Sequence, residues 1–197
     1  RTMPFTAHPK IDSETGNLVA FGYEAEGHGS DAVRVFEITP QGQKTWDVTV
    51  RVPYVGILHD YAVTQRYVMF HVIPMAIDQA QMERGGIHWS WREGLPTYFG
   101  YFRCGGDGKD VRWIKGPACG SVHVMGCYDD GKKLIVDMDI SEASPYSIMP
   151  NHDGSAWDAM KGAGRMHRLS VDLTRKSTAR YDIELLVTLL RDDVVLS

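Results

Sequence analysis

The stretch PYVGILHDYAVTQRYVMFHVIP, residues 53–74, places a histidine a few residues before an apolar, strand-like run. Two other stretches repeat the arrangement: TAHPK at 6–10 precedes NLVAFGYEA, and CGSVHVMGCYDDG at 119–131 precedes KKLIVDMDI. Periods of about 40 to 60 residues with about four short strands per unit are typical of β-propeller blades. The sequence therefore predicts three blade-like repeats. Their histidines, 51 and 64 residues apart, are His8, His59 and His123.

The rest of the chain also has the pattern of short strands. The candidate strands are rich in Val, Ile, Tyr, Phe and Trp, and they lie at 17–25, 32–39, 44–52, 66–74, 96–103, 110–116, 132–140 and 164–174. Clusters of Gly, Asp, Asn and Pro, such as SETGN, TPQGQ and YDDGKK, mark turns between them. The candidate helices are weak and lie around 76–85 and 155–164. We therefore expect an all-β protein.

The number of repeats bears on whether the propeller is complete. Three repeats are fewer than the four to eight blades that close a propeller. The chain also begins at Arg1 and ends in LLRDDVVLS, without an obvious closing element. We expect residues 1–197 to form part of a propeller domain, about three blades, with N- and C-terminal blades missing.

Composition narrows the classes of function. A chain of 197 residues can bury one sizeable core, and a formal net charge of -4 with scattered Lys and Arg argues against nucleic acid as a partner. There is no apolar run of the roughly 20 residues that span a bilayer, and the start of the chain lacks the layout of a signal peptide. Cys104, Cys119 and Cys127 have no CxxC spacing, so neither a disulfide framework nor a cysteine zinc site is indicated. We expect a soluble, cytoplasmic protein.

The repeated histidines suggest a metal site. In a propeller, corresponding positions of successive blades face one central axis, so histidines at one phase of the repeat should converge. Converging imidazoles without cysteines suit a borderline transition metal such as iron, copper or zinc. We therefore interpret His8, His59 and His123 as metal ligands, although a single histidine near a strand usually has a structural or surface role. The other histidines lack this phase and are interpreted as structural: His28, His71, His88, His152 and His167.

Several motifs resemble one known family. FTAHPKID, GNLVAFGY, LHDYAVTQRYVMFHVIP, LPTYFG and HVMGCYDDG resemble the carotenoid cleavage oxygenases, most closely their lignostilbene dioxygenase branch, over about residues 4 to 175. The resemblance implies a seven-bladed β-propeller with a mononuclear non-haem Fe(II) on its axis, held by four histidines from four blades. His8, His59 and His123 match the first three, and the fourth has no counterpart in this chain.

The chain departs from the family pattern at several points. Three glutamates of the family hydrogen-bond the iron histidines. One of them precedes this region, and another belongs to a GEFPR-like stretch expected just beyond residue 185, where this chain reads LLVTLLRDDVVLS. That glutamate is absent or the end has diverged. Gly126, Cys127 and Tyr128 stand where the family commonly has HVMNAFE-like residues. The tyrosine and lysine that grip a stilbenoid's 4-hydroxyl also precede this region.

The resemblance implies an Fe(II)-dependent dioxygenase that adds O₂ across one conjugated C=C bond of a hydrophobic stilbenoid or (apo)carotenoid, giving two carbonyl products. Such a substrate needs an apolar pocket. The candidate lining residues are Tyr54, Ile57, Leu58 and the loop at 76–91, although all of these also suit packing beneath a loop. Asp60, beside His59, could support a ligand, but a turn cap is the commoner role for such a residue, and we expect a turn cap. No nucleic-acid partner is expected, and peripheral membrane contact is expected only of a full-length protein.

Other classes of function stay open. A non-catalytic propeller binding module would bind no metal and would be indifferent to replacement of His59. An inactive oxygenase fragment, with three of four ligands and two open sheet edges, should aggregate or bind metal weakly. Within the family, isomerase and hydrolase chemistry and the choice between stilbenoid and carotenoid also stay open.

Overall fold

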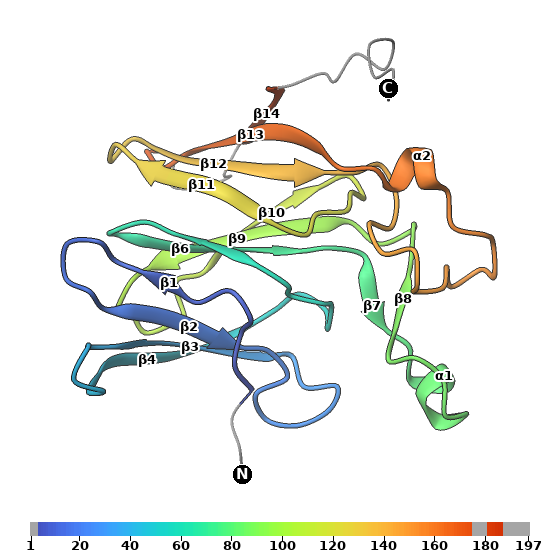
Figure 1. The fold of residues 1–197 in the computed structure, drawn as a ribbon, viewed down its shortest axis with the longest axis horizontal. Helices are drawn as coiled ribbons and strands as arrows, with labels where there is room; N and C mark the ends of the chain where they lie inside the picture. The colour runs from blue at the N-terminus through green and yellow to red at the C-terminus, as the bar shows by residue number, and fades with distance from the viewer. Residues whose placement is uncertain (1–3, 175–180, 187–197) are drawn as a thin grey trace, which may run out of the picture.

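The computed structural model describes residues 4–174 and 181–186, and it contains three four-stranded antiparallel sheets that lie one above another (Figure 1). The first sheet comprises β1 (Lys10–Ile11), β2 (Leu18–Gly22), β3 (Ala32–Ile38) and β4 (Lys44–Arg51). The second comprises β5 (Tyr61–Val63), β6 (Tyr67–Val72), β9 (Thr97–Arg103) and β10 (Arg112–Gly116). The third comprises β11 (Val124–Asp129), β12 (Lys133–Ile140), β13 (Arg165–Asp172) and β14 (Tyr181–Leu185).

The middle sheet is covered on both faces, which explains why β6 reads as the nearly continuous apolar run YVMFHV. Phe21 of β2 and Phe70 of β6 meet between the first and second sheets, with ring centroids 5.2 Å apart. A second cluster, which includes Met69, Phe99 and Leu134, joins the second sheet to the third. Each fully buried large apolar side chain contributes about 1.5–3 kcal/mol relative to exposure. Two apolar layers therefore hold the stack together.

The turn YDDGKK shows how local chemistry sets a hairpin. Gly131 has a φ of 86°, in the left-handed region that favours glycine. The Asp130 carboxylate accepts hydrogen bonds from the backbone N–H groups of Lys132 and Lys133, at 2.8 and 2.7 Å. The turn predicted between two strands is thus the connection of β11 to β12.

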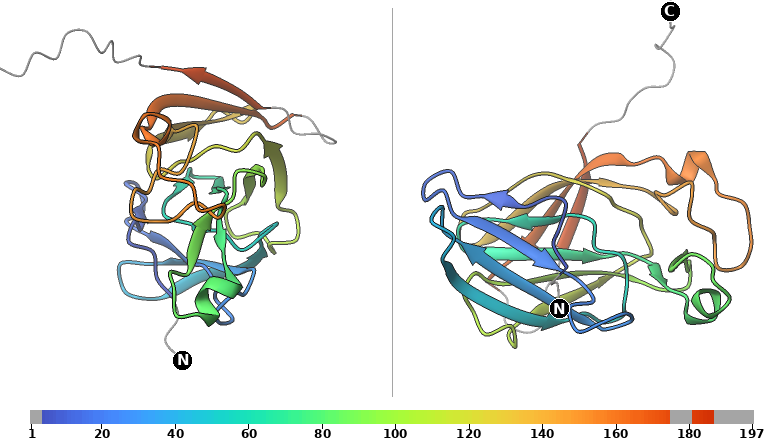
Figure 2. Two further views of the ribbon diagram at one scale, coloured as in Figure 1. Left: turned by 90° about the vertical axis from the view of Figure 1, so that its right-hand side faces the viewer. Right: turned by 60° about the horizontal axis from the view of Figure 1, so that its bottom comes forward.

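Between β6 and β9 the chain leaves the second sheet and forms a small separate layer. β7 (Met75–Ile77) pairs with β8 (Trp89–Trp91), and the short helix α1 (Gln79–Glu83) lies between them in sequence. A long connection between β12 and β13 carries α2 (Ala159–Gly162). Figures 1 and 2 show these elements gathered at one end of the sheet stack. Within the described residues, no helix has the length and apolar character needed to cross a membrane.

The structure confirms the eight predicted strands and both predicted helices, although the helices span only five and four residues. Three four-stranded sheets confirm an all-β chain with about three blades. The sequence analysis missed six strands: β1, β5, β7, β8, β11 and β14. β1, β5, β7 and β8 have only two or three residues, and β11 contains Gly126, so these patterns are too short or too interrupted to detect. The expected GEFPR-like stretch falls largely outside the described residues.

Candidate metal centre

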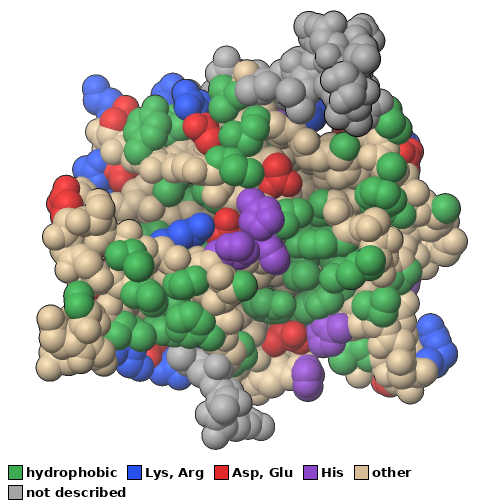
Figure 3. Space-filling model, viewed as in Figure 1, with side chains coloured by type: hydrophobic (Ala, Val, Ile, Leu, Met, Phe, Trp, Pro, Cys, Tyr) green, Lys and Arg blue, Asp and Glu red, His purple; other side chains and the backbone are tan. Residues whose placement is uncertain are grey.

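Each sheet presents one histidine at the same structural position. His8 lies two residues before β1, His59 lies two residues before β5, and His123 directly precedes β11. These three strands are the first strands of their sheets, and β5 contacts β11 directly. The three imidazoles meet on one face of the molecule, where Figure 3 shows a central group of histidine side chains. We call His8, His59 and His123 the histidine centre.

The ring nitrogens of the histidine centre lie very close together. Nε2 of His59 is 3.0 Å from Nε2 of His8 and 3.3 Å from Nε2 of His123. The three ring centroids are 4.8 to 5.0 Å apart, and the rings are strongly tilted to one another. The nitrogens therefore face a common point and do not stack as an aromatic cluster would.

These distances fit a bound metal ion. An imidazole–metal bond of about 2.1 Å places two ligand nitrogens about 3.0 Å apart at a right angle and about 3.4 Å apart at the tetrahedral angle. Metal ligation also requires neutral imidazoles with free lone pairs. Burial, together with the neighbouring rings of His8 and His123, lowers the pKa of His59, which favours its neutral form. The donor set of three nitrogens and no sulfur suits iron, copper or zinc.

One carboxylate ties the three histidine segments together. Asp60, only 2% exposed, accepts hydrogen bonds from the backbone N–H groups of Tyr61 and Val124, both at 2.8 Å. It also pairs with Lys10 Nζ at 2.7 Å. Burial alone would raise the pKa of Asp60, but the hydrogen bonds from Lys10, Val124 and Tyr61 outweigh it and lower that pKa. Asp60 is thus more than the turn cap expected, because its partners come from all three segments.

Asp139 holds the segment of His123 from the other side. Its carboxylate accepts hydrogen bonds from the backbone N–H groups of His123, at 2.6 Å, and Val122, at 3.0 Å. The Asp139 N–H donates to the carbonyl of His123 at 3.3 Å. The sequence analysis missed this residue. The available signal was the β11–β12 hairpin, whose turn at Asp130 and Gly131 brings the end of β12 beside His123.

An apolar surface adjoins the histidine centre. A cluster of Ile57, Ile73, Met75, Trp89 and Trp91 is buried, and Tyr146 and Met149 pack against it. The ring centroid of Tyr146 is 6.4 Å from that of His59. Figure 3 shows hydrophobic side chains directly beside the central histidines. Among the described residues the buried Tyr146 hydroxyl has no hydrogen-bond partner. The sequence analysis did not single out Tyr146, because nothing in its spacing links it to the three histidines.

The three predicted substrate-binding residues lie in different surroundings. Ile57 belongs to the apolar cluster beside the histidine centre. Leu58 and Tyr54 pack in the core between the first and second sheets. The Tyr54 hydroxyl donates hydrogen bonds to the carbonyls of Val72 and Pro96, at 3.1 and 2.9 Å. Of the three, Ile57 has the position best suited to contact a substrate, and that role stays a prediction.

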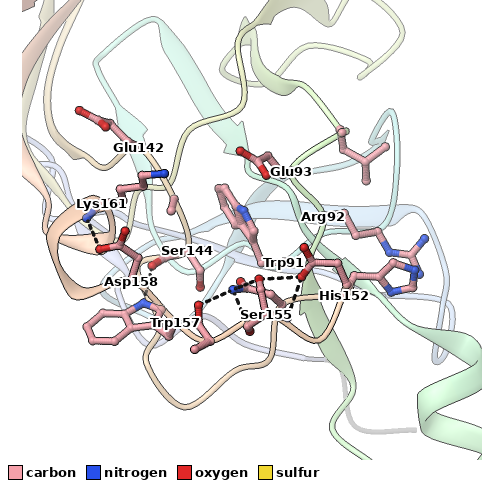
Figure 4. A pocket seen from close by; sticks show the side chains of 16 residues that line it. Trp91, Arg92, Glu93, Glu142, Ser144, His152, Ser155, Trp157, Asp158 and Lys161 are labelled. Carbon is pink, nitrogen blue, oxygen red and sulfur yellow. Dashed lines mark hydrogen bonds between the residues drawn. The ribbon is translucent and has the colours of Figure 1, made fainter.

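A cavity of about 710 Å³ lies apart from the histidine centre, between β8 and the connection that carries α2 (Figure 4). Trp91 and Trp157 line it, and the Trp157 Nε1–H donates to the carbonyl of Ser144 at 2.8 Å. Glu93 and Lys161 add charges of both signs. This mixed lining suits a conjugated hydrocarbon less well than the apolar cluster does.

The cysteines and two further histidines have structural surroundings. Burial raises the pKa of Cys104 to about 12 and also raises the pKa values of Cys119 and Cys127, as expected for packed thiols. His71 is fully buried on β6, and burial lowers its pKa to about 4, so this imidazole is neutral. His167 Nδ1 contacts the carbonyl of Arg165 at 2.7 Å.

The chain is similar in sequence to one protein family and to several named oxygenases. The family profile RPE65, described as retinal pigment epithelial membrane protein, matches residues 1–193. Resveratrol cleavage oxygenase 1 of Aspergillus fumigatus is 38% identical over 156 residues, which cover 78% of this chain and 31% of that protein. Lignostilbene-alpha,beta-dioxygenase isozyme III of Sphingomonas paucimobilis is 33% identical over 180 residues, which cover 90% of this chain and 37% of that protein. The chain thus spans about a third of the length of these relatives.

A solved structure gives the same result. The lignostilbene dioxygenase of Pseudomonas brassicacearum superposes with a TM-score of 0.84 at 36% sequence identity. The match covers 90% of this chain and 38% of that one. The three-sheet arrangement is therefore part of a larger fold in that enzyme.

Proposed function

The chain belongs to the RPE65, or carotenoid oxygenase, family, and from this premise we propose that it supplies three of four histidine ligands to the Fe(II) of a dioxygenase that cleaves a conjugated C=C bond. The observation that carries the proposal is the convergence of Nε2 atoms from three separate sheets, 3.0 and 3.3 Å apart, beside an apolar surface. When bound, Fe(II) supplies the redox chemistry that lets O₂ react with an alkene. The fourth ligand would come from outside this chain.

We propose a stilbenoid as the substrate class. Two relatives that are at least 33% identical carry the names resveratrol cleavage oxygenase and lignostilbene dioxygenase. In such a reaction the C=C bond breaks and each carbon receives one oxygen atom of O₂, so the products are two carbonyl compounds. A flat aromatic alkene could lie on the cluster that contains Ile57, Trp89 and Trp91, with its double bond toward the histidine centre.

The chain's own residues would orient and shield the reacting groups. Burial and the neighbouring imidazoles of His8 and His123 lower the pKa of His59, which favours the neutral ring that a metal requires. Asp60 and Asp139 fix the backbone of the histidine segments, which places the Cα atoms from which the three rings extend. The apolar cluster excludes water from one side of the centre.

The test is an anaerobic Fe(II) titration of the chain and of a form extended to the length of its relatives. O₂ and a 4-hydroxystilbene are then added, and aldehyde products are quantified. We expect one-to-one iron binding and aldehydes from the extended form, both lost in His59→Ala and both kept in the matched control His167→Ala. An extended form that binds no iron would contradict the proposal and leave a propeller binding module.

Two further outcomes separate the parts of the proposal. Iron binding without any aldehyde would contradict the cleavage reaction. Cleavage of an apocarotenoid but not of the stilbene would contradict the substrate class alone.

A further inference from the structure

A second group of metal-ligating side chains lies outside the histidine centre. Glu24, His28 and His88 each offer one ligand atom, and these atoms all lie within 4.8 Å of one another. Glu24 and His28 belong to the loop between β2 and β3, whereas His88 directly precedes β8. Figure 3 shows further histidine side chains near acidic ones on the face that carries the histidine centre. We call Glu24, His28 and His88 the Glu24 cluster.

The contacts within the Glu24 cluster are close and partly shielded from water. Oε1 of Glu24 lies 3.0 Å from Nε2 of His88 and accepts a hydrogen bond from the backbone N–H of Gly29 at 2.5 Å. The side chains of Glu24 and His88 are only 13% and 22% exposed. The ring centroid of His28 is 5.7 Å from that of His88. The carboxylate and both imidazoles thus surround one small volume at the protein surface.

The backbone at Glu24 is held in an uncommon conformation. Its φ is 51°, and it is the one residue other than glycine with a positive φ in the described part of the chain. This conformation is unfavourable for a non-glycine residue and persists only where the surroundings impose it. Gly27 and Gly29, with φ values of 129° and 76°, let the following loop curve back so that Gly29 reaches the Glu24 carboxylate. The loop therefore holds Glu24 beside His88.

Two imidazoles and one carboxylate form a donor set that divalent transition metals prefer. We propose that the Glu24 cluster is a second metal site, separate from the histidine centre, that takes a divalent transition-metal ion of the Zn²⁺ type. A bound ion would replace the direct Glu24–His88 contact, because both groups would share the ion. With three protein ligands, the ion keeps at least one position open to water.

The location of the Glu24 cluster gives the site a structural role. The ring of His88 contacts Trp89 with centroids 4.2 Å apart, and Tyr23 lies 6.0 Å from the same Trp89 ring. Trp89 and Tyr23 belong to the apolar cluster beside the histidine centre. A metal ion bound to the Glu24 cluster joins the β2–β3 loop to the start of β8, and so fixes one border of that apolar surface.

The two sites can be separated by titrating Zn²⁺ into the 197-residue chain with the His59→Ala replacement, which disables the histidine centre. We expect one Zn²⁺ per chain by calorimetry, and protection of the β2–β3 loop from hydrogen exchange on binding. Adding His88→Ala or Glu24→Gln should weaken binding by more than the roughly 10 to 100-fold that loss of a supporting partner costs. His167→Ala, added to His59→Ala in the same way, should leave binding unchanged.

His28→Ala guards against a folding artefact, because this side chain is exposed. It should weaken Zn²⁺ binding while leaving the circular dichroism and melting temperature of the metal-free chain unchanged. Absence of Zn²⁺ binding in the His59→Ala chain would overturn the second site. Binding that survives both His28→Ala and His88→Ala would overturn it as well. Neither result bears on iron at the histidine centre, so the two proposals fail independently.

Discussion

Replacement of Asp60 by asparagine tests how the three histidine segments are held together. The carboxylate accepts hydrogen bonds from the backbone N–H groups of Tyr61 and Val124 and pairs with the ammonium group of Lys10. An amide keeps one acceptor oxygen and turns the other into a donor. Because the two carboxylate oxygens serve different N–H groups, at least one donor faces another donor whichever way the amide is rotated. We expect Asp60→Asn to lose stability and metal affinity together.

The magnitudes follow from the contacts of Asp60. A buried donor left without a partner costs about 1–3 kcal/mol. Loss of the negative charge also weakens the contact with Lys10. Because the Lys10 side chain is 30% exposed, water partly compensates for this loss. The free energy of unfolding should therefore fall by about 2–4 kcal/mol. Loss of a group that positions metal ligands typically costs about 10 to 100-fold in affinity, and we expect that range for the histidine centre.

Urea unfolding measures the loss of stability. Anaerobic Fe(II) titration measures the loss of metal affinity, and a His88→Ala background restricts that measurement to the histidine centre. Asp47→Asn is the matched control. This replacement also removes one negative charge from a carboxylate that pairs with basic side chains, those of Arg34, at 2.5 Å, and Lys44. Asp47 lies on β4, at the opposite edge of the first sheet from β1, so it does not hold a histidine segment. An Asp60→Asn chain that is less stable but binds iron as tightly as Asp47→Asn would refute the argument.

Three further predictions concern stability. The hydrogen bond from Arg34 lowers the pKa of Asp47 to about 2. The stability that this ion pair contributes, at most about 1 kcal/mol after solvent screening, is therefore complete above pH about 4 and is lost as the pH falls toward 2. Measurements of the free energy of unfolding at acid pH should show this loss, and Asp47→Asn should abolish it. A Cβ at Gly100 would lie 2.1 Å from the Trp113 ring, so Gly100→Ala should lower the free energy of unfolding by about 1–3 kcal/mol or more, and an unchanged urea midpoint would contradict this packing. Tyr146→Phe removes a buried hydroxyl that has no partner among the described residues, so it should keep or raise the melting temperature, and a clear decrease would contradict the lack of a hydrogen bond.

The sequence predicted the longer strands of each four-stranded sheet well but missed the edge strands that follow the histidines. β6 and β12 have six and eight residues with strong apolar patterns, so burial alone marks them as strands. β1 and β5 have two and three residues, and their pairing comes from the neighbouring strand and not from their own pattern. The repeat was nevertheless visible, because each histidine lies one or two residues before the first strand of its sheet.

The convergence of the three histidines was predictable from the sequence, but the residues that support their segments were not. The phase of the repeat was enough to group His8, His59 and His123. A regular hairpin with its turn at Gly131 would pair Asp139 with Val124. A bulge between Val124 and Gly126 shifts this register by one residue, so that Val124 pairs with Met138. The backbone N–H of Asp139 then donates a hydrogen bond to the carbonyl of His123. No local rule predicts a bulge from these residues. The Asp60 contacts join residues up to 64 positions apart, which no periodic pattern can reveal.

The supports found in this chain act on the backbone of the histidine segments and not on the rings. Metal-bound histidines normally donate their second ring N–H to a carboxylate or carbonyl, which fixes the tautomer and the aim of the ring. Within residues 4–174 and 181–186, no carboxylate hydrogen-bonds a ring nitrogen of His8, His59 or His123. Asp60 and Asp139 therefore position the backbone of the histidine segments, and within the described residues no hydrogen bond from a carboxylate orients the rings themselves. At the proposed metal site, the rings would need partners from outside the described residues to reach full metal affinity.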